Sequence, residues 1–134
     1  MQLIPTVYFP GFCDEAIAFY QSLPGCELLF VRRIGDCIDP SQIQPGTEQK
    51  ILRAALRFGP SVVYMSDGHG AAAASFQGFS LSVTLPSVAQ AERVIAALAD
   101  GGKVLLPPRP TGWAGTLGVL LDRFGVHWTV EATG

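Results

Sequence analysis

A histidine, a threonine and a carboxylate alternate along the stretch LDRFGVHWTVE near the end of the chain. His127, Thr129 and Glu131 take every second position, and in a strand such residues share one face. Imidazole and carboxylate are ligands that divalent metals accept. No third ligand stands beside them, since His69 lies in a Gly-His-Gly connector and could join only if that segment folded over the face. We therefore expect no metal, and interpret the three side chains as polar strand surface or as hydrogen-bonding groups for a ligand.

Two arginines in the segment KILRAALRFG point to a different chemistry. Arg53 and Arg57 share one face of a strand, and a guanidinium both makes bidentate contacts with carboxylate or phosphate and stacks on aromatic rings. One of them could pair with Glu131 or with an anionic or planar ligand. The alternative is a cross-strand salt bridge, which contributes at most about 1 kcal/mol when exposed. Tyr64 and Trp113 could form an aromatic wall for the ligand, or else core or dimer contacts.

The strand that follows Gly78 divides into an apolar and a polar face. Ser80, Ser82 and Thr84 alternate with apolar residues, which predicts that the apolar set packs on a helix and the polar set looks into a candidate pocket. The alternative is a solvated face, which is common for antiparallel sheets packed on one side only. The candidate ligand-binding residues are Arg53, Arg57, Tyr64, Ser80, Ser82, Trp113, His127, Thr129 and Glu131.

The elements that must position these residues form an internal repeat. The order strand, helix, strand, strand, strand occurs twice, at an offset of about 75 residues. We expect one domain over 1–134, with repeat one at about 1–67, a connector at 68–77 and repeat two at about 78–134. In repeat one we expect strands at 3–9, 26–32, 51–58 and 61–66, a helix at 13–22 and a loop at 35–49. In repeat two we expect strands at 79–85 and 103–106, a closing hairpin that turns at 122–125, a helix at 88–99 and a loop at 107–112.

Helix and strand patterns also predict the core. Cys13, Ala16, Ile17 and Tyr20 form one apolar helix face, and Trp128 faces the helices by alternation. Ser87 and Gln90, three residues apart, predict a capping box at the start of the second helix.

Composition limits the partners. Hydrophobic residues make up 49% of the chain and charged residues 15%, below the roughly 25% usual for soluble domains, so we expect surface to be covered in a homodimer. The formal net charge is -2 and basic residues are dispersed, so neither nucleic acid nor a membrane is expected as a partner. The opening MQLIPTVYF lacks secretion-signal features, which predicts a cytoplasmic location. Three cysteines fit neither a disulfide framework nor a C-x-x-C zinc site.

Three motifs, spread along nearly the whole chain, resemble one family. FCDEAIAFYQSLPGCELLF is similar to an A-I-x-F-Y-x-x-x-x-G opening helix, and KILRAALRFGPSVVYMSD to a K-I-M-H-A-x-L-x-x-G stretch. GWAGTLGVLLDRFGVHWTV resembles a W-G-x-x-x-G-x-x-x-D-P-F-G-x-x-W ending. These are motifs of the PhnB-like branch of the vicinal oxygen chelate superfamily, which includes glyoxalase I, bleomycin-resistance proteins and extradiol dioxygenases. The resemblance implies an α+β fold in which two βαβββ repeats form a curved mixed-sheet cup with helices on its outer face.

The resemblance also locates where a metal would bind in the wider superfamily. His or Glu from the first and last strand of each repeat holds it, and those four places fall near Pro5, Tyr64, Gly78 and Thr129. None of these is a histidine or a carboxylate, and Arg53 replaces the histidine of K-I-M-H-A. PhnB-like proteins often carry a demethylubiquinone methyltransferase-like description, yet this sequence has no cofactor-binding glycine loop.

The leading hypothesis is therefore a metal-free and cofactor-free homodimer that binds a small aromatic or anionic molecule in the cup, as the resemblance to bleomycin-resistance proteins implies. The alternative is a lyase or transferase on a small oxygenated substrate, with Glu131 as general base, Arg53 stabilising an oxyanion and Tyr64 as a possible proton donor. A third possibility is a structural or partner-binding dimer with the loop at 35–49 lying across the cup.

Overall fold

The computed structural model describes residues 1–68 and 73–133. The chain divides into two compact units, Met1–Ala74 and Ser75–Gly134. His69, the conditional metal ligand of the sequence analysis, lies outside the described residues. In the described part, no helix is long and apolar enough to cross a membrane.

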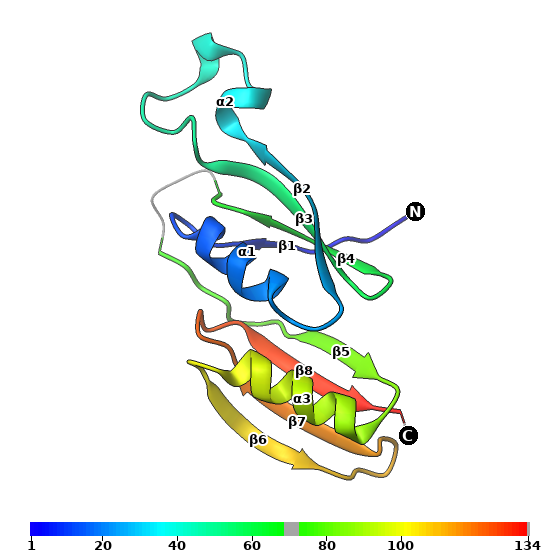
Figure 1. Ribbon diagram of the computed structural model, residues 1–134. Coiled ribbons are helices and arrows are strands. Elements are labelled where there is room, and N and C mark those ends of the chain that lie inside the picture. Colours follow the sequence, from blue (N-terminus) through cyan, green and yellow to red (C-terminus); the bar gives the residue numbers. More distant parts are fainter. Residues whose placement is uncertain (69–72, 134) are drawn as a thin grey trace. The chain divides into compact units, whose positions relative to one another are not determined.

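Unit one consists of a four-stranded mixed sheet with a helix on one face (Figure 1). The strand order is β1-β4-β3-β2, with β1 parallel to β4 and the other neighbours antiparallel. Its elements are β1 (Thr6–Tyr8), α1 (Cys13–Gln21), β2 (Cys26–Arg33), α2 (Ile34–Cys37), the 3-10 helix η1 (Pro40–Gln42), β3 (Ile51–Phe58) and β4 (Ser61–Ser66).

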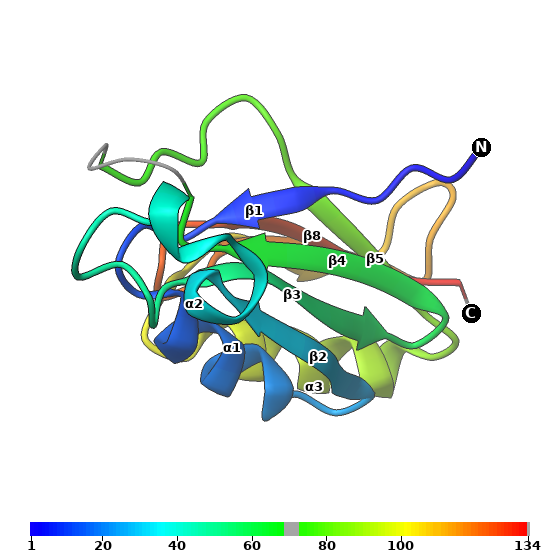
Figure 2. The same ribbon diagram turned by 90° about the horizontal axis from the view of Figure 1, so that it is seen from above.

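The helix α1 packs through the predicted apolar face, because Cys13, Ala16, Ile17 and Tyr20 are all buried. The Tyr20 ring lies 6.4 Å from that of Phe58, which places this face of β3 under the helix. Figure 2 shows α1 against one face of the strands of unit one. The opposite face of the sheet is therefore free of helix α1.

The buried carboxylate of Asp67 ties the start of α1 to the sheet. Its Oδ1 accepts hydrogen bonds from the backbone N–H of Gly11 (3.1 Å) and Cys13 (3.2 Å), and its Oδ2 from that of Ile51 (2.7 Å). A carboxylate satisfies the free N–H groups at a helix start and is favoured by the helix dipole there. Asp67 thus fixes α1, β3 and the end of β4 to one another.

Unit two repeats this arrangement with strand order β5-β8-β7-β6 and the helix α3 across one face (Figure 1). The parallel pair is β5 and β8. Its elements are β5 (Leu81–Leu85), α3 (Val88–Ala99), β6 (Lys103–Arg109), β7 (Thr116–Leu121) and β8 (His127–Ala132).

Capping and packing fix α3 on its sheet. The Ser87 Oγ accepts from the Gln90 backbone N–H at 3.2 Å, which confirms the predicted N-cap. Gly118 faces the helix, because a Cβ there would lie 2.8 Å from the Ile95 Cδ1. The predicted core position of Trp128 is confirmed, since only 2% of the residue is exposed.

The structure confirms the two βαβββ repeats and the α+β class. It differs from the sequence expectation in four places. β1 covers only Thr6–Tyr8 of the strand expected at 3–9. The loop expected at 35–49 contains most of α2 and all of η1, and β5 starts at Leu81, so Ser80 precedes the strand. The loop expected at 107–112 is wrong at its start, because β6 continues to Arg109 through Pro107 and Pro108. β6 is an edge strand, where a missing N–H costs no ladder hydrogen bond.

Candidate functional site

The face of the unit-one sheet turned away from α1 carries arginines and aromatic rings. Phe30 pairs in register with Ala55, and Ala55 with Tyr64, so these three form one row across β2, β3 and β4. Arg32 and Arg53 are direct partners in the next row. Directly opposed residues share a sheet face. We call this surface the arginine face, defined by Phe30, Arg32, Arg53, Arg57 and Tyr64.

Two of these arginines are stacked on rings. The Arg53 guanidinium carbon lies 4.3 Å from the centroid of the Tyr64 ring, and that of Arg32 lies 4.1 Å from the centroid of Phe30. Contacts of this kind contribute roughly 0.5–1 kcal/mol at exposed sites. Both arginines are exposed, whereas the two rings are half-buried. Stacking therefore restricts each cation while its N–H groups still reach solvent.

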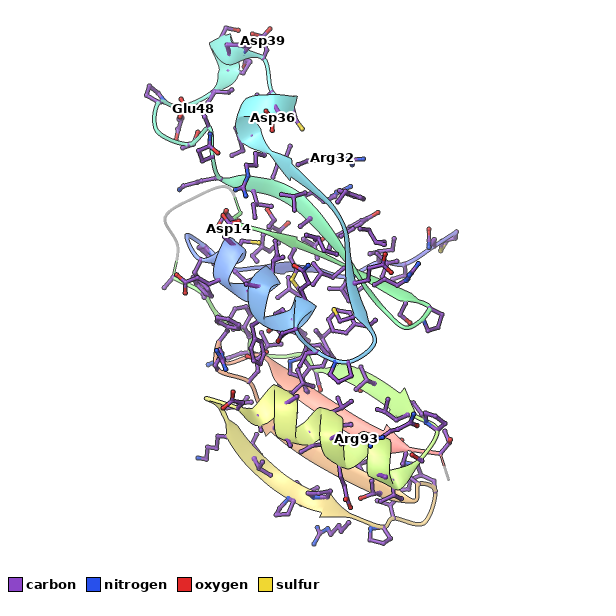
Figure 3. The ribbon with its side chains drawn as sticks, in the orientation of Figure 1. Asp14, Arg32, Asp36, Asp39, Glu48 and Arg93 are labelled. Atoms are coloured by element: carbon purple, nitrogen blue, oxygen red, sulfur yellow. The ribbon has the colours of Figure 1, made fainter. Side chains whose placement is uncertain are left out.

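The neighbouring Arg33 points to the opposite face. It forms an ion pair with Asp14 on α1, N to O 2.9 Å, and also donates to the Gln49 carbonyl at 2.7 Å. The Arg33 hydrogen bond lowers the pKa of the Asp14 carboxyl below its usual value. Figure 3 shows Asp14 on α1 and the Arg32 side chain extending from β2 away from that helix.

Arg57 is engaged by a carboxylate within its own sheet. It forms an ion pair with Glu27, its register partner on β2, and both side chains are largely exposed. The sequence left open a cross-strand salt bridge or a ligand contact for this residue. The ion pair with Glu27 is the cross-strand alternative, and it satisfies the charge of Arg57.

The second unit presents a polar face, defined by Ser80, Ser82, His127, Thr129 and Glu131. The hydroxyls of Ser80 and Thr129 are hydrogen-bonded at 3.2 Å, and Thr129 is the register partner of Ser82. The three β8 residues are half-buried and alternate with buried ones, as predicted. β7 makes the face less polar than expected, because its side chains here are Leu117, Val119 and Leu121.

His127 and Glu131 differ in their surroundings. The His127 Nδ1 is buried and has no hydrogen-bond partner among the described residues. Glu131 is paired in register with Thr84 and Leu117, and no ion pair involves it in the described part of the chain. Trp113 is 73% exposed in the loop before β7. Arg53 and Glu131, the two candidate catalytic residues, belong to different units.

The side chains at the four positions where the superfamily holds a metal are not suited to bind one. Tyr64 carries the Arg53 cation over its ring, Thr129 shares its hydroxyl with Ser80, and neither Pro5 nor Gly78 has a ligating side chain. A permanent cation beside one of four places repels a second cation. Among residues 1–68 and 73–133, no group of three or more His, Cys, Asp or Glu side chains could hold a metal.

Cys13 and Cys26 are not activated as nucleophiles. Burial, with smaller contributions from Asp67 and Asp14, raises the pKa of the Cys13 thiol to about 12. Burial raises the pKa of Cys26 to about 11. A thiol with such a pKa is protonated near neutral pH and is a poor nucleophile. Cys37 is exposed on α2.

Sequence reasoning missed Arg32 as a member of the site. The stretch CELLFVRR places two arginines side by side, and a β-bulge between Leu28 and Phe30 breaks the alternation that would assign their faces. One signal was available: Phe30 lies two positions before Arg32, the spacing at which a ring and a cation share a strand face.

Comparisons with known proteins agree with the motifs. The family model described as 3-demethylubiquinone-9 3-methyltransferase matches residues 1–131. The protein YjdN of Escherichia coli K12 is 33% identical, covering 98% of this chain and 95% of its own. The crystal structure of PA1353 from Pseudomonas aeruginosa is 37% identical with a TM-score of 0.85, covering 98% of this chain and 97% of that one.

A more distant solved structure shares the fold. The PhnB protein of Bacillus cereus is 22% identical with a TM-score of 0.77, covering 98% of this chain and 99% of that one. Taken with the motifs and the repeated βαβββ units, the match over residues 1–131 shows that the chain belongs to the family described as 3-demethylubiquinone-9 3-methyltransferase, the PhnB-like branch of the vicinal oxygen chelate superfamily.

Proposed function

We propose that this protein binds a small aromatic or anionic molecule on its arginine face and acts by binding rather than through a metal. The observation that carries the proposal is the stack of the Arg53 guanidinium on the Tyr64 ring, 4.3 Å from its centroid. An exposed, restricted guanidinium offers a flat cationic surface and a fork of N–H donors. Planar rings and oxyanions are the chemical groups that match it.

The packing below the arginines supports the same proposal. Ala55 is only 1% exposed although it lies on the arginine face, because its neighbours in the row are the rings of Phe30 and Tyr64. Each of the two rings carries a guanidinium group, so a planar ligand would meet the stacked guanidinium groups above an apolar layer. Small-molecule sites combine mostly apolar contact with a few polar groups that orient the ligand.

The experiment is an NMR titration of the ¹⁵N-labelled chain with 2-naphthoate, a planar aromatic anion. We expect saturable shifts centred on Arg53 and Tyr64. Arg53→Gln should weaken binding at least about fivefold, since it removes both the stacked cation and its donors. Arg93→Gln, a change on the exposed side of α3, is the matched control and should leave the affinity unchanged.

Two results would contradict the proposal. If 2-naphthoate shifts no residue of the arginine face at concentrations up to several millimolar, or if the two variants bind equally well, the arginine face is not the ligand site and the proposal fails.

A second candidate function is a lyase or transferase activity in which Glu131 acts as the general base. The observation in its favour is the half-buried Glu131 carboxylate, which has no ion pair in the described part of the chain. A free carboxylate of this kind can accept a proton. For any turnover that is found, Glu131→Gln should abolish it; turnover that survives the change would remove this candidate.

We also propose that the protein is a homodimer. Val104 and Leu105 on the edge strand β6 are each more than 40% exposed, and Trp113 is 73% exposed. Exposed apolar side chains on an unpaired sheet edge can be covered by association with a second copy of the chain. Light scattering at about 50 µM should give twice the chain mass of 14.3 kDa. A monomer at that concentration would contradict the proposal.

A further inference from the structure

We infer that Arg32 and Arg53 together form a binding subsite for an oxyanion, a carboxylate or phosphate carried by the planar ligand. The inference rests on the proposed function and names the chemical class of its ligand. It adds Arg32, which no sequence motif indicated, and it excludes Arg57 from the subsite.

The first support is the register of the two arginines. Arg32 on β2 and Arg53 on β3 are direct partners in the antiparallel pair. Side chains in this relation have Cβ atoms about 4.5–5.5 Å apart, and like charges so placed destabilise a sheet. Neither arginine forms an ion pair with any of the described residues. The sheet therefore holds two cations side by side without a compensating anion of its own.

The second support is the contrast with the other arginines of the unit. Arg33 is neutralised by Asp14 and Arg57 by Glu27. Arg33 and Arg57 thus each have a carboxylate partner, whereas Arg32 and Arg53 have none among the described residues. A bound oxyanion would complete the missing charge balance, with each guanidinium donating through its fork.

The third support is the way the two cations are held. Arg32 stacks on Phe30 and Arg53 on Tyr64, so both guanidinium groups lean toward the row that contains Ala55. Adjacent rows of one sheet face lie about 6.6–6.8 Å apart along a strand. An oxyanion held between the two guanidinium groups would therefore be within reach of both arginines, with the ring of the ligand lying against the stacked side chains. The class is an aromatic acid or an aryl phosphate.

The experiment compares three naphthalene ligands that share one ring system. 2-Naphthoate and 2-naphthyl phosphate are anionic, whereas 2-naphthamide is the neutral isostere of the carboxylate. Affinities are measured by NMR titration for the wild-type chain, Arg32→Gln, Arg32→Lys and the control Arg93→Gln. The thermal midpoint of each variant is measured first, so that only folded protein is compared.

We expect each anion to bind the wild-type chain about tenfold more tightly than 2-naphthamide at low ionic strength, since hydrogen bonds between charged groups are stronger than neutral ones. Arg32→Gln should remove most of that advantage while leaving the affinity for 2-naphthamide nearly unchanged. Arg32→Lys should retain part of it, because lysine keeps the charge without the planar fork. Preference for the phosphate or for the carboxylate then identifies which oxyanion the subsite favours.

Three results would overturn the inference, and they are distinguishable from one another. If naphthoate and naphthamide bind equally, the proposed binding function stands but the oxyanion subsite does not exist. If the anions are preferred and Arg32→Gln keeps the preference, the oxyanion binds elsewhere. If none of the three ligands binds, both the inference and the proposed function fail.

Discussion

Asp122 should be one of the most sensitive positions of unit two. The residue is 3% exposed and directly follows β7. The Oδ1 accepts from the backbone N–H of Phe124 (2.9 Å) and Val126 (3.0 Å), and the Oδ2 accepts from the Trp128 indole N–H (2.9 Å). One side chain therefore shapes the β7–β8 turn and orients the largest fully buried residue of the core.

Asp122→Asn removes one of these contacts while keeping the shape. If the amide oxygen stays on the two backbone N–H groups, the amide NH2 is left facing the Trp128 indole N–H, and two donors oppose one another. The change loses a charge-assisted hydrogen bond and leaves a buried donor unsatisfied, so we expect the free energy of unfolding to fall by about 2–4 kcal/mol. Asp122→Ala loses all the contacts and should cost about 3–5 kcal/mol.

Urea unfolding followed by circular dichroism measures these changes, and hydrogen exchange at the indole N–H gives an independent readout. The exposed Trp113 provides an internal reference for fast indole exchange. Asp100→Asn is the matched control, because that carboxylate is 76% exposed in its ion pair with Arg123 and should contribute less than about 1 kcal/mol. An Asp122→Asn cost no larger than that of the control, with slow indole exchange at Trp128 unchanged, would refute the reasoning.

Two further predictions concern thiols and glycines. At pH 8 Cys37 should react with a thiol reagent at the rate of an exposed cysteine. Cys13 should react only in denaturant, because burial raises its pKa to about 12. Equal labelling of both in the folded protein, measured by peptide mass, would contradict this. Gly102→Ala should lower the free energy of unfolding by about 2–4 kcal/mol, because its Cβ would lie 2.2 Å from the Leu121 carbonyl oxygen. Gly112→Ala is the control: a Cβ there meets open space, so the free energy of unfolding should change by less than about 0.5 kcal/mol. Similar urea midpoints for the two variants would refute the packing argument.

The elements that carry the site could be predicted where alternation is strict. β3 at Ile51–Phe58, β4 at Ser61–Ser66 and α3 at Val88–Ala99 match the expected bounds, because each is a strongly periodic segment ended by turn or capping residues. The prolines of β6 were read as a loop, since the sequence does not reveal which strand lies at an edge.

Pairing partners were harder to predict than faces. Alternation placed Arg53 and Arg57 on one face of their strand, but only the register across β2, β3 and β4 shows that Tyr64 and Arg32 stand beside Arg53. Register depends on bulges, and the bulge in β2 leaves no strong mark in its composition. The role of Glu27 as the partner of Arg57 was missed for the same reason.

The arrangement of charge on the arginine face is what connects its structure to a function. A sheet selected for stability alone gains by placing a carboxylate opposite each arginine, as Glu27 does for Arg57. Arg32 and Arg53 depart from that rule while their rings hold them in place. Local conflicts that are built in rather than relaxed are expected at functional sites, where the stabilising partner is the ligand. The like-charged pair, more than the presence of arginine itself, is therefore the feature on which we base the proposal of a binding surface.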